Sequence, residues 1–136
     1  MTAQIVAQKL GLSIQIDPRL REVNQGEWEG MLASDIAVRY PTEWEARQQG
    51  PVHTRPPGGE KVAEVDARVW TAADDNARRY PAGSVLIVSH ALARATLPSR
   101  ASNLPLEHVY HLIPANGCLE MIHWPSDKSS EGARRA

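Results

Sequence analysis

The stretch "SVLIVSHALAR", Ser84 to Arg94, decides the fold class of this chain. Val85 to Val88 form a continuous run of branched apolar residues, which is typical of a strand buried on both faces of a mostly parallel sheet. A segment with helical character follows directly, from Leu92. A buried strand that runs into a helix predicts an α/β fold.

The rest of the chain also alternates between helix-like and strand-like segments, and the spacing of apolar residues predicts where each element lies. Helical periodicity predicts helices over residues 2–10, 32–40, 61–79, 92–97 and 106–112. Thr42 and Glu45 form a capping-box pattern and predict one more helix that ends before Gly50. Pro98 is expected to interrupt the helix that begins at Leu92. Strand patterns cover residues 12–16, 84–88 and 117–124. We therefore expect one domain over 1–124 and a disordered tail over 125–136.

Composition narrows the function classes. The chain has 136 residues, a formal net charge of −1 and a single cysteine, Cys118. Near-zero charge gives no reason to expect nucleic acid or a membrane as a partner. One cysteine excludes an intrachain disulfide and favours a cytoplasmic location. The first residues do not resemble a signal peptide, and no spaced cysteine, histidine and aspartate set predicts a metal. We expect no cofactor.

His90 is the first candidate functional residue. Ser89 and His90 stand at the end of the most apolar predicted strand, and ligands of open α/β sheets gather at the carboxyl ends of strands. The helix N-terminus that follows favours anions. His90 either faces a phosphate or carboxylate, or is a capped core histidine, and the local pattern does not choose between the two.

Glu22 is the second candidate. It ends the segment "RLRE", Arg19 to Glu22, which lies in a loop after a predicted strand. A glutamate there is a candidate general acid where its surroundings favour the protonated form. The alternative is a surface ion pair, which is the commoner fate of an arginine and glutamate cluster.

Four segments together resemble the histidine phosphatase superfamily, the phosphoglycerate mutase-like group. They are "TAQIVAQKLGLSIQIDPRLREVNQGEWEG", "PPGGEKVAEVDARV", "GSVLIVSH" and "LPLEHVYHLIPANGCLEMIHW". Their order matches the family from about Thr2 to Trp124. The resemblance implies a three-layer αβα sheet, and a phosphorylated metabolite as the substrate.

The resemblance also implies a mechanism. In this family a histidine in an Arg-His-Gly motif becomes phosphorylated, a second histidine helps to hold the phosphoryl group, and a glutamate protonates the leaving oxygen. His90 matches the second histidine and Glu22 matches the proton donor. Ser89 and Ala91, on either side of His90, are the expected substrate-binding neighbours. Ala91 stands where the family usually has glycine, so it would be strained if that position needed a positive φ.

The match is incomplete, because no Arg-His-Gly occurs among the 136 residues. We expect an N-terminally truncated family member that lacks the nucleophile and the first two family strands, and that is inactive alone. The segment 84–88 would then have open edges on both sides. Three alternatives remain. The first is a non-catalytic protein that binds a partner or a phosphorylated ligand, with a strand-paired homodimer as one form of it. The others are mutase-type phosphotransfer, and another chemistry with His90 as base and Glu22 as acid.

Overall fold

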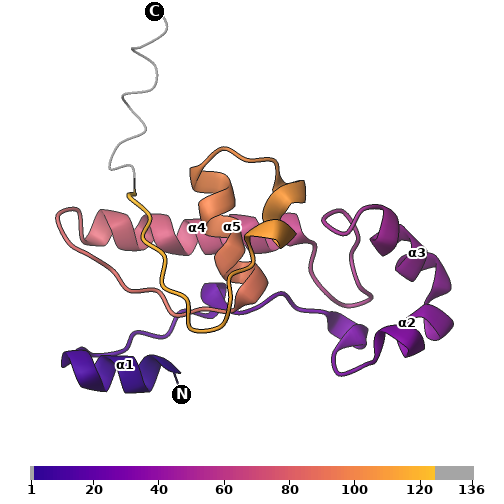
Figure 1. Ribbon diagram of the computed structural model, residues 1–136, viewed down its shortest axis with the longest axis horizontal. Helices are drawn as coiled ribbons and strands as arrows, with labels where there is room; N and C mark the ends of the chain where they lie inside the picture. Colours follow the sequence, from indigo (N-terminus) through magenta and orange to yellow (C-terminus); the bar gives the residue numbers. More distant parts are fainter. Residues whose placement is uncertain (1, 125–136) are drawn as a thin grey trace, which may run out of the picture.

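The computed structural model describes residues 2–124, and this part of the chain is helical with extended connections. Figure 1 shows α4 running across the molecule, with α5 crossing it and the α2–α3 pair set apart at one end. The α-helices are α1 (Thr2–Leu10), α2 (Ala33–Arg39), α3 (Pro41–Gln49), α4 (Val62–Arg79) and α5 (Ala91–Ala101). The 3₁₀ helices are η1 (Pro18–Leu20), η2 (Gly26–Trp28) and η3 (Leu106–Leu112).

The packing of α4 against α5 forms one half of the core. Helical spacing of apolar residues gives α4 a buried stripe, and Val65 and Val69 on it are fully buried. They pack in one cluster with Ala93 and Leu97 of α5. The Glu64 carboxylate accepts the Lys61 N–H at 2.8 Å, which satisfies one free amide at the start of α4.

The other half of the core lies between α5 and η3. Leu92 and Ala95 of α5 pack with Val109 of η3 and with Val62 at the start of α4. Because α5 contributes to both clusters, its N-terminal end is held on two sides. This fixes the position of His90, the extended residue that precedes the helix.

The predicted sheet is wrong: residues 2–124 contain no β-strand. The segments 12–16, 84–88 and 117–124, which the sequence predicts as strands, have neither strand nor helix assignment apart from a turn near Gly117. Within the described residues, no backbone N–H of 13–16, 84–89 or 119–124 donates to a backbone carbonyl. The three-layer αβα sheet is therefore not formed.

A strand needs a hydrogen-bonded neighbour, and that explains the error. Apolar patterning reports which side chains would be buried in a sheet, but not whether a second segment is present to complete the ladder. Here the apolar side chains of the segment 84–88 are partly exposed; Val85 and Leu86 keep 43% and 46% of their surface accessible. Ile87 and Ile122 instead pack on the α4–α5 cluster without pairing their backbones.

The helices follow the prediction more closely, with two corrections. Pro98 does not interrupt α5, which continues through it to Ala101. The capping box of Thr42 and Glu45 is also wrong, because the N-cap of α3 is Tyr40, two residues before Thr42, and the helix begins at Pro41. The predicted tail, 125–136, lies outside the described residues.

Candidate functional site at the start of α5

His90 is the N-cap residue of α5. Its backbone is extended, with φ −108° and ψ 172°, and its carbonyl accepts the Arg94 N–H at 2.8 Å, the first hydrogen bond of the helix. The imidazole makes no capping bond and is exposed. The neighbouring Ser89 hydroxyl donates to the carbonyl of Leu20 at 2.7 Å, which connects the start of α5 to the segment that carries Glu22. His90 is thus not a capped core histidine.

The Glu22 carboxylate lies directly on the N-terminus of α5. Its Oε2 accepts the Leu92 N–H and its Oε1 accepts the Ala93 N–H, both at 3.0 Å. Oε1 also accepts the Val23 N–H at 2.9 Å. The two residues predicted as site members, Glu22 and His90, therefore meet at one helix end although 68 positions separate them in the chain.

The sequence predicts an anion at this helix end, and the anion found there is the side chain of Glu22. A helix N-terminus has free amides and a positive dipole end, so a carboxylate is stabilised there. A carboxylate offers about four acceptor positions, and three N–H groups occupy three of them here. The fourth position is free, so a proton can sit there while these three bonds persist.

Ala91, predicted beside the substrate, is the first residue of α5. Asn103 is the one non-glycine residue of 2–124 with a positive φ, at 53°. Ala91 is therefore free of left-handed strain, and the alanine costs the backbone nothing at this position.

Arg68 of α4 is a polar residue of the site that the sequence analysis does not single out. Its Nη1 donates to the carbonyls of Arg19 and Arg21 at 2.7 and 2.8 Å, and its Nη2 donates to the carbonyl of Glu22 at 3.0 Å. Its Nε and Nη2 also donate to the Glu60 carboxylate, each at 2.9 Å. We call this group of five residues the Arg68 clamp.

Glu60 extends the clamp to the following residues. Its Oε2 accepts the Asn24 N–H at 2.9 Å and its own N–H donates to the Asn24 carbonyl at 2.8 Å. The hydrogen bond from Arg68 holds the pKa of Glu60 below its usual range. Gly59 is required here, since a Cβ on it would lie 2.6 Å from the Asn24 oxygen. In the sequence, Arg68 is one of several charged residues between the apolar positions of a predicted helix. Nothing in that pattern predicts its hydrogen bonds to the segment 19–22.

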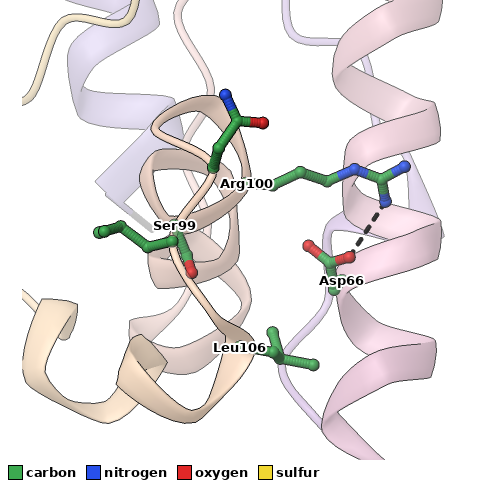
Figure 2. A pocket seen from close by; sticks show the side chains of 6 residues that line it. Asp66, Ser99, Arg100 and Leu106 are labelled. Carbon is green, nitrogen blue, oxygen red and sulfur yellow. Dashed lines mark hydrogen bonds and ion pairs between the residues drawn. The ribbon is translucent and has the colours of Figure 1, made fainter.

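A pocket of about 280 Å³ lies at the other end of α5 (Figure 2). Asp66 of α4 and Arg100 of α5 line it and form an ion pair of 3.0 Å. Asp66 Oδ1 and Ser99 Oγ are buried and have no hydrogen-bond partner among the described residues. Ser99 lies eight residues beyond Ala91, about 12 Å along the helix. The pocket is therefore separate from the His90 and Glu22 site.

Other histidines do not join the site. His53 Nε2 lies 3.3 Å from a carboxylate oxygen of Glu107, and His108 and His111 are exposed on η3. Within residues 2–124, no three side chains of the metal-binding types gather closely enough to hold a metal ion. Over the same residues, no helix is long and apolar enough to cross a bilayer.

Known proteins with similar sequences point to one family. The probable phosphoglycerate mutase GpmB of Yersinia enterocolitica is 41% identical over 108 residues, which cover 76% of this chain and 48% of that protein. The protein of the same name from Erwinia tasmaniensis is 34% identical over 104 residues, with the same coverage. The chain thus spans about half the length of the curated relatives it matches.

Solved structures of similar proteins also match the fold of this chain. The YhfR protein of Bacillus stearothermophilus superimposes with a TM-score of 0.72 at 32% identity, over 80% of this chain and 54% of that one. The alpha-ribazole phosphatase of Shigella flexneri also reaches 0.72, at 26% identity, over 81% of this chain and 55% of that one. The likeness lies in the path of the backbone, since residues 2–124 of this chain contain no paired strands.

The family model of the histidine phosphatase superfamily (branch 1) matches residues 1–131. With that match over nearly the whole chain, and with relatives above 30% identity, the chain belongs to the histidine phosphatase superfamily.

Proposed function

We propose that this chain supplies the His90 and Glu22 part of a phosphomonoesterase site that works through a phosphohistidine. The observation that carries the proposal is the pair of hydrogen bonds from the Leu92 and Ala93 amides to Glu22, immediately after His90. Residues that match the family's phosphate-contacting histidine and its proton donor thereby come together at one helix end. Small phosphorylated metabolites are the proposed substrates.

The proposed reaction has two steps. A histidine nitrogen attacks phosphorus, the P–O ester bond breaks, and the leaving oxygen takes a proton from Glu22. Water then attacks the phosphohistidine, the N–P bond breaks, and Glu22 takes a proton from the water. The exposed imidazole of His90 contacts the phosphoryl oxygens in both steps and, when protonated, stabilises their charge. Ser89 and Ala91 border the same phosphate position.

The 136 residues alone are proposed to be inactive. The attacking histidine of the family belongs to an Arg-His-Gly motif that does not occur in this sequence. A histidine and a carboxylate without further positive charge do not bind a phosphate dianion well, because the carboxylate repels it. The similar proteins include a phosphatase and a probable phosphoglycerate mutase, and phosphoglycerate mutase-type transfer is the alternative reaction of the complete site.

The test is a complementation assay with p-nitrophenyl phosphate. The chain alone is expected to give no hydrolysis above background. A fusion that places the Arg-His-Gly segment of a family member before residue 1 is expected to hydrolyse the substrate and to trap a phosphohistidine. Replacement of His90 by alanine in the fusion is expected to lower kcat/KM by about a hundredfold or more.

The matched control is His108→Ala, which removes an exposed histidine on η3 and is expected to leave the rate unchanged. Turnover by the chain alone that disappears in His90→Ala would refute the proposed inactivity. A folded, phosphorylated fusion in which His90→Ala and His108→Ala behave alike would refute the role of His90.

A second candidate function is a non-catalytic, strand-paired homodimer. The observation that favours it is the exposed apolar segment 84–88, whose backbone amides donate to no carbonyl in residues 2–124. Two copies could satisfy these groups by pairing the segments. In either function, the near-neutral charge supports neither nucleic acid nor a membrane as partner, and the single cysteine supports a cytoplasmic location.

A further inference from the structure

We infer that Arg68 is the positioning residue that holds Glu22 on the N-terminus of α5. The inference rests on the proposed function for the role of Glu22, but its geometry is independent of that role. Arg68 makes five hydrogen bonds, three to backbone carbonyls of the segment 19–22 and two to Glu60. The guanidinium has five N–H donors, so its full donor capacity is used on one loop and its anchor.

The clamp acts on the backbone on both sides of the catalytic carboxylate. Arg68 holds the carbonyl of Glu22 itself, and Glu60 holds the next residue but one, Asn24, at both its N–H and its carbonyl. Because the main chain is fixed at these points, the Glu22 carboxylate is held within hydrogen-bonding distance of the Leu92 and Ala93 amides. Arg68 therefore orients Glu22 without contacting its carboxylate.

Burial and charge make the clamp rigid. The Arg68 and Glu60 side chains are 19% and 26% accessible, so their ion pair is largely shielded from solvent. A planar guanidinium with several charge-assisted bonds fixes direction as well as distance. A lysine at this position keeps the charge but directs its three donors from one nitrogen, so it cannot reach three carbonyls and a carboxylate together.

The first arm of the test uses the 136-residue chain and amide hydrogen exchange measured by NMR. In Arg68→Lys, exchange of the Leu92 and Ala93 amides is expected to accelerate about tenfold, because they lose their acceptor, while amides of the second half of α5 keep their rates. Arg78→Lys is the matched control: it lies on the same helix and pairs with Asp74, away from the clamp.

Unchanged Leu92 and Ala93 exchange in folded Arg68→Lys would overturn the inference. Equal acceleration along all of α5 would also overturn it, since that indicates a general loss of stability. Glu60→Gln is the second variant if Arg68→Lys does not fold. It keeps an acceptor for the Asn24 N–H but removes the charge that anchors Arg68, and a smaller acceleration at the same two amides is expected.

The second arm uses the active fusion and two substrates. Nitrophenolate leaves without a proton, whereas an alkoxide needs one from Glu22. Arg68→Lys is expected to lower kcat for an alkyl phosphate at least tenfold more than kcat for p-nitrophenyl phosphate, with little change in KM. Equal loss on both substrates would overturn the positioning role. An inactive fusion would defeat the proposed function alone, because the exchange arm is read without turnover.

Discussion

Glu22 caps α5 in this structure, and its proposed role as a proton donor would use the same oxygens. As a cap, it accepts three N–H groups at the start of α5. As a proton donor, it must carry a hydrogen on one of those oxygens and hold it toward the leaving group. The fourth acceptor position is the one that can hold that hydrogen while the cap persists. Positioning of the carboxylate, rather than its presence alone, therefore decides whether it can work as an acid.

The pKa of the Asp66 carboxyl is shifted in the opposite direction from that of Glu60. Burial raises the pKa of Asp66, and its ion pair with Arg100 opposes that change only in part. A carboxyl whose pKa is higher in the folded chain binds more protons there. Its contribution to stability is thus complete below the unfolded value of 3.8 and is lost as the pH rises through the folded pKa. Glu60, with a lowered pKa, loses its contribution as the pH falls.

Asp66→Asn is therefore expected to raise the free energy of unfolding at pH 7 by about 0.5 kcal/mol, because the buried charge is removed while an acceptor oxygen stays. The difference from wild type should vanish near pH 3. Urea unfolding at several pH values measures the gain at pH 7 and its disappearance at low pH. Asp75→Asn, at an exposed partner of Arg19, is the control and should not stabilise at pH 7. A loss of more than about 1 kcal/mol in Asp66→Asn would mean that the ion pair with Arg100 dominates.

At the level of elements, the sequence predicts helices well and strands badly, for one physical reason. The spacing of apolar residues predicts α4 and α1 correctly, because the backbone hydrogen bonds of a helix join residues only four positions apart. The run Val85 to Val88 carries an equally strong pattern, but its hydrogen bonds depend on another segment. The Arg68 clamp was missed for a similar reason, because its acceptors are carbonyls 46 to 49 positions away.

Within α5, Pro98 is the residue that departs most from helix chemistry. It cannot donate to the Arg94 carbonyl, yet α5 continues to Ala101, where Ser102 N–H donates to the Pro98 carbonyl at 3.0 Å. Pro98→Ala is expected to restore the missing bond and to raise the free energy of unfolding by about 1 kcal/mol, measured by urea unfolding. This increase should be smaller than the usual free-energy cost of a proline inside a helix, because the backbone of α5 already accommodates the proline ring.

Pro105→Ala is the matched control for that variant. Pro105 lies outside the α-helices, before η3, so its replacement only loosens the unfolded chain and should lower stability slightly. A lower stability of Pro98→Ala than of wild type would show that the packing of the half-buried proline ring outweighs the hydrogen bond.

On the scale of the whole molecule, the two core clusters share α5 and leave the extended segments at the surface. Ile16, Leu119 and Met121 are among the most exposed apolar side chains, with 93%, 78% and 82% accessible. The same helices that build the core also build the site, so the start of α5 is fixed although no sheet is formed over residues 2–124. Over residues 2–124 these segments lack a hydrogen-bonded neighbour, so pairing between copies, as proposed for the homodimer, would make their behaviour depend on protein concentration.

Hydrogen exchange read at two concentrations tests this dependence. At low micromolar concentration the amides of residues 84–89 are expected to exchange at nearly unprotected rates, while those of Val65 to Ala73 in α4 are slow. If copies pair through this segment, a hundredfold higher concentration should slow the 84–89 amides, and light scattering should report dimers. Leu86→Lys places a charge on the open edge and should abolish both changes without altering α4. Slow exchange at 84–89 that does not vary with concentration would contradict the unpaired backbone itself, and fast exchange at both concentrations would exclude the homodimer.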